Sequence, residues 1–256
     1  MANSTIDPMV APNGALTADL VRRGRKLARL LADARFRAGL RHGVAATIEH
    51  EAALAGRDFA SVVDIGASRG QFTLLSAGLY PEARIFAFEP LPLPYAVLAR
   101  VTARNSRIRT HRVAIGPQAG PARMHVMRPD DCSSLLAPTE RQTTIFRGSG
   151  RNGVATVTVG PLDVFVAARE LAPPSLLKLD VQGFERAALE GCAALLDRFA
   201  AVYVECSFER LYEGQALADE VLAHLGAHGF GLKGVYNAVY DGRGRAVQAD
   251  FLCARR

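Results

Sequence analysis

Three carboxylates and a lysine stand where the chain passes from apolar runs into turns. Lys178 and Asp180 close the run LLKLD, Glu185 follows in VQGFERAALEG, and Glu205 closes AVYVE. Residues two apart on a strand share one face of a sheet, so Lys178 is expected to pair with Asp180, or to reach Glu205. Neighbouring carboxylates raise one another's pKa, and a carboxylate with a raised pKa can take the proton of a hydroxyl nucleophile.

These residue types can supply a general base for a hydroxyl nucleophile. We predict that Asp180 is the general base or accepts the substrate hydroxyl, and that Glu185 and Glu205 position the substrate. The alternative for Lys178 and Glu205 is a structural ion-pair network at the strand ends. His111 is a rival base, but its distance from the strand end favours a structural role. Three carboxylates could also hold a divalent cation, but no closely spaced DxD pair supports one, so no metal is predicted.

A second group of residues, in SVVDIGASRGQF and RIFAFEP, has the spacing of a nucleoside site. Asp64 ends one apolar run, and a turn with Gly66, Ser68 and Gly70 leads into a helix whose free N–H groups can face a ligand. Glu89 ends the next run 25 residues later, near the roughly 20-residue spacing at which an acid accepts both hydroxyls of a ribose. The alternative is a tight strand–helix connection with no ligand, followed by a surface glutamate.

The turn differs from the dinucleotide fingerprint GxGxxG, because it is D-x-G-x-x-x-G. Asp64 would repel a pyrophosphate, and Glu89 would repel a 2′-phosphate. Both acids suit S-adenosylmethionine, which has an ammonium, a sulfonium and a ribose but no phosphate. An NAD-dependent oxidoreductase on a Rossmann-like sheet remains the alternative enzyme, and a non-catalytic nucleoside-binding adaptor is the alternative outside enzymes.

In this order, the segments DIGASRGQF, AFEP, KLDVQGFERAALEG and YVECSFERLYEGQ resemble the FkbM-type S-adenosylmethionine-dependent methyltransferases, from about residue 61 to the C-terminus. The resemblance implies a seven-stranded methyltransferase sheet and methyl transfer, most often to oxygen. It also implies a set of cofactor contacts. The methionine pocket would be shaped by Asp64, Gly66 and Gly70, the ribose would be held by Glu89, and the adenosine side would be lined by Pro90, Leu91, Ala114, Ser133 and Ser134. Ala67–Ser68 stands where family members often carry Ala–Asn, a mild departure.

The elements that must position these residues follow an α/β pattern. From residue 58 onward short apolar runs alternate with helical stretches, which predicts a Rossmann-like, seven-stranded, mostly parallel sheet with helices on both faces. The last 25 residues predict an antiparallel hairpin turned by DGRG. RMHVM and VATVTV predict a β pair within an insertion, and residues 128–153 are candidates for acceptor contacts or a lid. Phe208, Tyr212 and Gln215 are further acceptor candidates.

Charge divides the chain into an arm and a catalytic domain. Residues 1–56 are expected to form a disordered start, over 1–14, and a basic helical arm, and residues 57–256 the methyltransferase domain. The net charge of +6 originates in the arm, whose basic residues are Arg22, Arg23, Arg25, Lys26, Arg29, Arg35, Arg37 and Arg41. They form either a solvated helix face or a docking surface for a phosphate-bearing partner or a membrane surface. Nucleic acid is ranked low as a substrate, because no aromatic-rich basic groove is evident.

Composition sets the remaining limits. Hydrophobic residues make up 49% of the 256 residues, enough for one large domain. No stretch reaches the roughly 18 apolar residues of a membrane span, and the first residues lack the features of a secretory signal. The four cysteines form no CxxC pair. We therefore expect a cytoplasmic enzyme with reduced thiols, acting on a saccharide, a glycolipid headgroup or a small metabolite.

Overall fold

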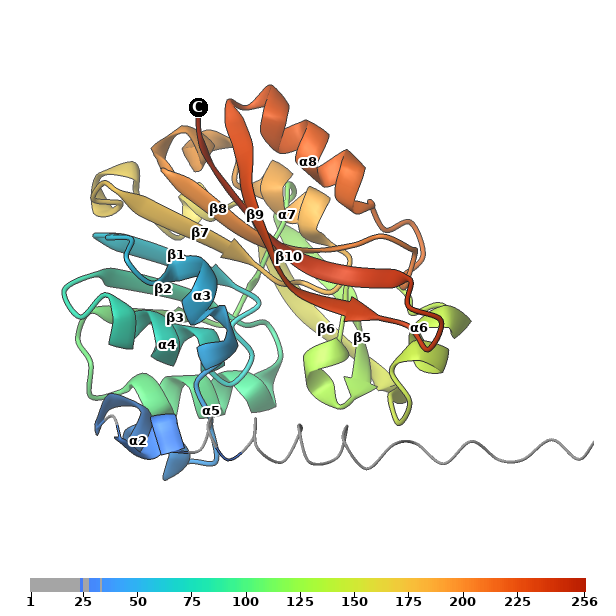
Figure 1. Cartoon of the computed structure of the whole chain (residues 1–256), viewed down its shortest axis with the longest axis horizontal. Coiled ribbons are helices and arrows are strands. Elements are labelled where there is room, and N and C mark those ends of the chain that lie inside the picture. The colour runs from blue at the N-terminus through green and yellow to red at the C-terminus, as the bar shows by residue number, and fades with distance from the viewer. Residues whose placement is uncertain (1–23, 25–27, 33) are drawn as a thin grey trace, which may run out of the picture.

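The fold is built around one seven-stranded sheet (Figure 1). The computed structural model describes residue 24, residues 28–32 and residues 34–256. In spatial order the strands are β3 (Ile108–His111), β2 (Arg84–Phe88), β1 (Ser61–Ile65), β7 (Ser175–Leu179), β8 (Ala201–Ser207), β10 (Ala246–Arg255) and β9 (Phe230–Tyr240). β10 is antiparallel to both of its neighbours, and the other neighbouring strands are parallel. The predicted mostly parallel sheet with a C-terminal antiparallel hairpin is confirmed.

Helices cover both faces of this sheet. β1 and β7 are buried at every residue, as expected for apolar strands of a parallel sheet with two covered faces. One face packs against α2 (Ala34–Leu40), α3 (Glu51–Leu54), α4 (Gln71–Leu79) and α5 (Pro92–Thr102). The other face packs against α7 (Glu185–Gly191) and α8 (Ala218–Ala227). Alternate residues of β1 enter the two cores, Val62 the first and Val63 the second.

A second, three-stranded sheet stands beside the carboxyl ends of the central strands (Figure 1). Its order is β4 (Ala114–Ile115), β6 (Gly150–Gly160) and β5 (Gly120–Arg128). The antiparallel pairing of β5 with β6 is the β pair predicted from RMHVM and VATVTV. Between them lie the 3-10 turn η2 (Asp130–Cys132) and the short helix α6 (Glu140–Ile145). The insertion therefore supplies one wall at the end of the main sheet where ligands bind.

Three sequence-predicted elements have other boundaries in the structure. The apolar pattern of RIRTHRVAIG predicts one strand, but in the structure β3 stays with β2 while β4 leaves to pair with β6. The pattern of FERAALEGCAALLDRF predicts one helix, but the segment forms α7 followed by the 3-10 helix η5 (Ala193–Arg198). The pattern of LDVFVAA predicts a short helix, and the segment contains the 3-10 helix η3 (Leu162–Val164). In the last two cases the apolar spacing still places Leu162, Leu195 and Leu196 in the core.

The described part of the N-terminal arm packs into the core. Phe36 of α2 is 1% exposed and Leu30 is 2% exposed. A Cβ added at Gly78 of α4 would lie 2.8 Å from the ring of Phe36, so glycine is what lets α2 approach α4 this closely. The predictions for residues 1–14 and for Arg22, Arg23, Arg25 and Lys26 lie outside the described residues. No helix among the described residues is long and apolar enough to span a membrane.

We expect Phe36→Ala to lower the free energy of unfolding by about 3–5 kcal/mol, because it removes a fully buried ring and leaves a cavity against α4. Urea denaturation followed by circular dichroism measures this loss. Leu31→Ala is the matched control, since Leu31 is 50% exposed in the same segment, and its cost is expected within about 0.5 kcal/mol. Equal, small costs for both variants would show that α2 is not part of the folded core.

Candidate active site

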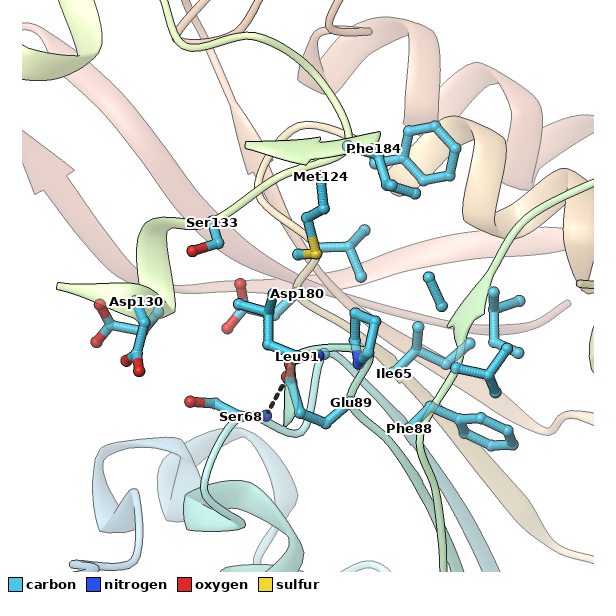
Figure 2. Close-up of a pocket in the computed structure, with 18 residues that line it drawn as sticks. Ile65, Ser68, Phe88, Glu89, Leu91, Met124, Asp130, Ser133, Asp180 and Phe184 are labelled. Atoms are coloured by element: carbon cyan, nitrogen blue, oxygen red, sulfur yellow. Dashed lines mark hydrogen bonds between the residues drawn. The ribbon is translucent and has the colours of Figure 1, made fainter. Parts of the chain in front are cut away.

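A cavity opens at the carboxyl ends of β1, β2 and β7, with the second sheet as its far wall (Figure 2). About 650 Å³ there is free of protein atoms, part of it open to solvent. The residues that line it are Ile65, Gly66, Ser68, Phe88, Glu89, Pro90, Leu91, Val113, Ala114, Ile115, Met124, Asp130, Asp131, Ser133, Leu135, Asp180, Val181 and Phe184. Its floor is apolar, and its charged side chains are carboxylates.

The glycine-rich turn after β1 is fixed by a close approach between two strand ends. Gly66 has φ +79°, and a Cβ there would overlap the carbonyl oxygen of Asp180. Only glycine therefore lets the end of β1 run against the end of β7. Ser68 also has a positive φ, of 47°. Gly70, with φ +96°, is the N-cap of α4 and faces Leu98 of α5 rather than the cavity.

Glu89 is buried at the end of β2 and points into the cavity. Its two carboxylate oxygens accept hydrogen bonds from the backbone N–H groups of Ser68 (3.0 Å) and Leu91 (2.8 Å). Figure 2 shows the bond to Ser68. Burial raises the pKa of Glu89 to about 7, and the two backbone bonds oppose that rise. The carboxylate is thus held rigidly, and each oxygen keeps a lone pair for a ligand hydroxyl.

Lys178 and Asp64 form a buried ion pair beneath the turn. They are register partners across β7 and β1, and Lys178 Nζ lies 3.1 Å from Asp64 Oδ1. Lys178 Nζ also donates to the carbonyl of Gly66 (3.0 Å) and lies 3.8 Å from Asp180. Asp64 Oδ2 accepts from the Thr73 hydroxyl at 2.6 Å. Burial alone would lower the pKa of Lys178, but Asp64 and Asp180 outweigh it and raise that pKa.

Asp180 and Glu205 lie at one mouth, joined by an amide. Gln182 Nε2 donates to Asp180 Oδ1 (2.9 Å) and lies 3.2 Å from Glu205 Oε2. The two carboxylates orient the amide with Nε2 towards them, and the Tyr212 hydroxyl lies 3.0 Å from Gln182 Oε1. Gln248 donates to Glu205 Oε1 at 2.7 Å. Burial, and then the charge of Asp180, raise the pKa of Glu205 well above its usual value.

Glu185 faces the backbone and does not line the cavity. Its Oε1 accepts from the N–H groups of Val181 and Gly183, both at 3.1 Å. Burial raises its pKa to about 7. Both N–H groups belong to the loop between β7 and α7. Glu185 therefore shapes the loop that carries Asp180.

The other sequence-predicted residues are divided between the cavity and its surroundings. Pro90, Ala114 and Ser133 line it, whereas the Ser134 hydroxyl accepts from Leu136 N–H at 3.0 Å. The ring of His111 stacks on Phe88 at 4.8 Å, away from the cavity, and burial lowers its pKa.

The acceptor candidates after β8 also differ in their positions. Phe208 is 43% exposed and packs on Phe251. Gln215 is buried and accepts from the N–H groups of Leu211 and Tyr212. Of these candidates, Tyr212 reaches the mouth, through its contact with Gln182.

Sequence reasoning missed several residues of the mouth. Arg69, in the glycine-rich turn, makes a bidentate ion pair with Asp130 of η2, at 2.5 and 2.6 Å. This pair ties the turn after β1 to the insertion. Asp131 lines the cavity, and Gln182 joins the two carboxylates. The adjacent acids of RPDDCSS were the available signal for Asp130 and Asp131, and nothing in the sequence marked Gln182.

A metal ion has no evident site among the described residues, where no group of three or more histidine, cysteine or acidic side chains could hold one. Asp180 and Glu205 are instead engaged by the amides of Gln182 and Gln248. The carboxylates are thereby arranged as hydrogen-bond acceptors for a ligand.

Comparisons with known proteins agree with this geometry. A sequence profile described as "Methyltransferase FkbM domain" matches residues 64–232. The 2-O-methyltransferase NoeI of Sinorhizobium fredii (strain NBRC 101917 / NGR234) is 28% identical over 160 residues, covering 60% of this chain and 66% of NoeI. The 31-O-demethyl-FK506 methyltransferase FkbM of Streptomyces tacrolimicus is 30% identical over 193 residues, covering 66% of this chain and 72% of that protein. Methyltransferase sdnD of Sordaria araneosa is 29% identical over 153 residues, covering 51% and 59%.

The match to NoeI thus spans just under two thirds of NoeI's length. The profile covers more than half of the chain, and residues 64–232 contain the turn after β1, Glu89, Asp180 and Glu205. The strand order, the cavity at the strand ends and this match agree, and the chain belongs to the family of methyltransferases with an FkbM domain.

Proposed function

We propose that the protein transfers a methyl group from S-adenosylmethionine to a hydroxyl oxygen of a saccharide or another small molecule. One observation carries the choice of cofactor. Four carboxylates line the cavity, Glu89, Asp130, Asp131 and Asp180; Arg69 pairs with Asp130, and none of the described residues that line the cavity is basic. Such a cavity repels the pyrophosphate of NAD, whereas it favours a sulfonium and an ammonium. The cavity therefore suits S-adenosylmethionine better than NAD.

The residues divide into two tasks. Glu89 would accept the ribose hydroxyls, because its carboxylate is fixed by Ser68 and Leu91 and faces the cavity. The apolar surfaces of Phe88, Leu91 and Met124 would hold the adenine ring. Bound S-adenosylmethionine supplies an electrophilic methyl group already activated by its sulfonium.

Asp180 stands between the cofactor cavity and a second hollow. That hollow is lined by Pro129, Asp131, Cys132, Phe146, Arg147, Ser149, Asp180, Gln182, Glu205 and Gln248. Its carboxylates and amides suit an acceptor rich in hydroxyl groups. The names of two relatives, a 2-O-methyltransferase and a 31-O-demethyl-FK506 methyltransferase, support oxygen as the acceptor atom.

The proposed reaction requires alignment and one proton transfer. The acceptor oxygen forms a bond to the methyl carbon as the carbon–sulfur bond breaks, and that electron pair stays on sulfur. The hydroxyl proton passes to the carboxylate of Asp180, which Gln182 holds in place. Glu205, on the same hollow, would help to position the acceptor. Alignment of the acceptor in the second hollow would supply much of the remaining acceleration.

Calorimetric titration of the purified protein with S-adenosylmethionine, S-adenosylhomocysteine and NAD tests the proposal. We expect micromolar binding of the first two and none of NAD. Binding of NAD alone would replace the methyltransferase proposal by the oxidoreductase alternative.

We also propose a cytoplasmic location, which is supported by the four free cysteines, of which three are buried. Docking of the basic arm to a phosphate-bearing partner or a membrane surface also remains a proposal.

Glu89→Gln is expected to weaken S-adenosylmethionine binding at least about tenfold, because an amide cannot accept from two backbone donors and two ribose hydroxyls together. The wild-type affinity should also depend on pH. The ribose hydroxyls favour the carboxylate form, and the pKa of Glu89 is raised to about 7. Affinity should therefore fall below pH 7, approaching about tenfold per pH unit, and level off above it.

Calorimetry between pH 5.5 and 8.5 measures both effects, with Glu170→Gln as the control. Glu170 lies outside the cavity, where it pairs with Arg109. An unchanged affinity in Glu89→Gln, or a pH dependence that survives this substitution, would remove Glu89 from the ribose site.

A further inference from the structure

We propose that a cleft between α6 and the β9–β10 turn binds a phosphate or diphosphate group of the acceptor, so that the acceptor is a phosphorylated saccharide or a similar small molecule. This inference rests on the proposed function. Figure 1 shows α6 beside the turn of the C-terminal hairpin. The cleft is lined by Arg141, Thr144, Ile145, Arg147, Tyr240, Asp241, Gly242, Arg243 and Arg245. About 1130 Å³ there is free of protein atoms, part of it open to solvent.

The cleft carries an excess of positive charge. Four arginines line it, and two carboxylates, Asp241 and Glu209, pair with them. Arg141 makes a bidentate pair with Glu209, at 2.7 and 2.9 Å, and also contacts Asp241. Arg245 pairs with Asp241 at 2.7 Å. Two positive charges are thus left without a compensating carboxylate in the cleft.

Those two charges belong to Arg147 and Arg243. Within residues 34–256 neither guanidinium makes an ion pair or a side-chain hydrogen bond, and both residues are exposed. Arg147 follows α6, and Arg243 lies in the hairpin turn, so they approach the cleft from opposite walls. Two guanidinium groups facing one hollow can hold phosphate oxygens in bidentate fashion, which is the geometry that arginine favours.

The wall that carries Arg243 is ordered before any ligand binds. Asp241 Oδ1 accepts from the N–H groups of Arg243 (2.9 Å) and Arg245 (3.0 Å). These bonds and the pairing with Arg245 lower the pKa of Asp241, so its carboxylate stays ionised. A turn fixed in this way loses less conformational entropy when it binds an anion.

The basic cleft adjoins the acceptor hollow, because Arg147 lines both. The acceptor hollow is acidic, with Asp131, Asp180 and Glu205, and a phosphate would be repelled from it. A ligand with hydroxyl groups at one end and an anion at the other matches this division of charge. Tyr240, which is 61% exposed on the cleft wall, offers a ring face against which a sugar or base can stack.

Inorganic pyrophosphate and a hexose 1-phosphate, with the unphosphorylated hexose as a comparison, test this inference by calorimetry on the full chain. We expect both phosphates to bind, and the hexose alone to bind at least about tenfold more weakly. The double variant Arg147→Ser/Arg243→Ser should weaken pyrophosphate binding at least about tenfold. The matched control is Arg100→Ser/Arg104→Ser, which removes the same charge from exposed positions at the end of α5; it should change the affinity less than about twofold.

The outcomes separate this inference from the proposed function. If S-adenosylmethionine binds the wild-type protein and the cleft variant equally, but the cleft variant leaves pyrophosphate binding unchanged, the phosphate site is wrong and the methyltransferase proposal stands. Binding only to vesicles that contain phosphatidylglycerol, with no soluble phosphate bound, would also overturn the site. Failure of S-adenosylmethionine to bind the wild-type protein would instead count against the proposed function.

Discussion

Asp180→Asn is expected to lower kcat by about 10²- to 10⁴-fold and to leave the affinity for S-adenosylmethionine within about threefold. Asparagine has the same shape and can still accept from Gln182, so the mouth should keep its geometry. It cannot take the proton of the acceptor hydroxyl. The contact that Lys178 loses is the distant one with Asp180, at 3.8 Å, and it keeps its ion pair with Asp64 and its hydrogen bond to the Gly66 carbonyl. Single-turnover methyl transfer to a hydroxyl acceptor, with calorimetry for the cofactor, measures the two quantities separately.

Glu205→Gln is the control, because it changes the other carboxylate of the same mouth. Burial and the charge of Asp180 raise the pKa of Glu205, and glutamine keeps the length and shape of its side chain. We expect its kcat to fall by less than about tenfold. A fully active Asp180→Asn variant would exclude Asp180 as the base, and a larger loss in Glu205→Gln would transfer that role to Glu205.

The fold could be predicted because each strand and helix is indicated by the residues of its own segment. The apolar runs that became β1, β2, β7 and β8 are buried at nearly every residue, and each is followed by a helix or a 3-10 turn. Alternation of this kind leaves few topologies open. Parallel strands end at the same edge, so placing Glu89 and Asp180 at one cavity needed only the positions where their runs stop.

The directions of the carboxylates could not be predicted, because they depend on register and on backbone donors. Asp64 and Lys178 pair because the register of β1 and β7 places them opposite each other, and the sequence had favoured Asp180 or Glu205 as the partner. Glu185 turns inward because free N–H groups at Val181 and Gly183 capture it.

The three-stranded sheet, which forms the far wall of the cavity, was harder to predict from the sequence. The pairing of β5 with β6 was predicted, but β4 is a strand of two residues that pairs with β6 more than 40 residues later. Such pairings over long sequence separation carry little local signal. Met124 therefore entered the cavity without any marking in the sequence, whereas the adjacent acids of RPDDCSS were a signal for Asp131. The same insertion carries Arg147, on which the proposed phosphate site depends.

Breaking the buried ion pair of Lys178 and Asp64 is expected to have a second large effect, on the free energy of unfolding. Lys178→Met is expected to lower the free energy of unfolding by about 3–5 kcal/mol, because it leaves Asp64 as an uncompensated buried charge. Asp64 is 0% exposed, and its remaining partner is the Thr73 hydroxyl. Methionine matches the length of the lysine stem, and the contact that it loses at the ring of Phe72 is that of the charged Nζ, which lies 5.3 Å from the ring centre. The loss should therefore be electrostatic rather than steric.

The double variant Lys178→Met/Asp64→Asn distinguishes charge from packing. It removes both charges, and asparagine can still accept from Thr73. If the pair is a charge-compensating unit, the double variant should recover at least about half of the loss seen in Lys178→Met alone. Urea denaturation of the two single variants and the double variant completes the cycle. Additive losses would mean that Lys178 and Asp64 act independently. The role of Lys178 would then lie in its bond to the Gly66 carbonyl, which holds the turn against the end of β7.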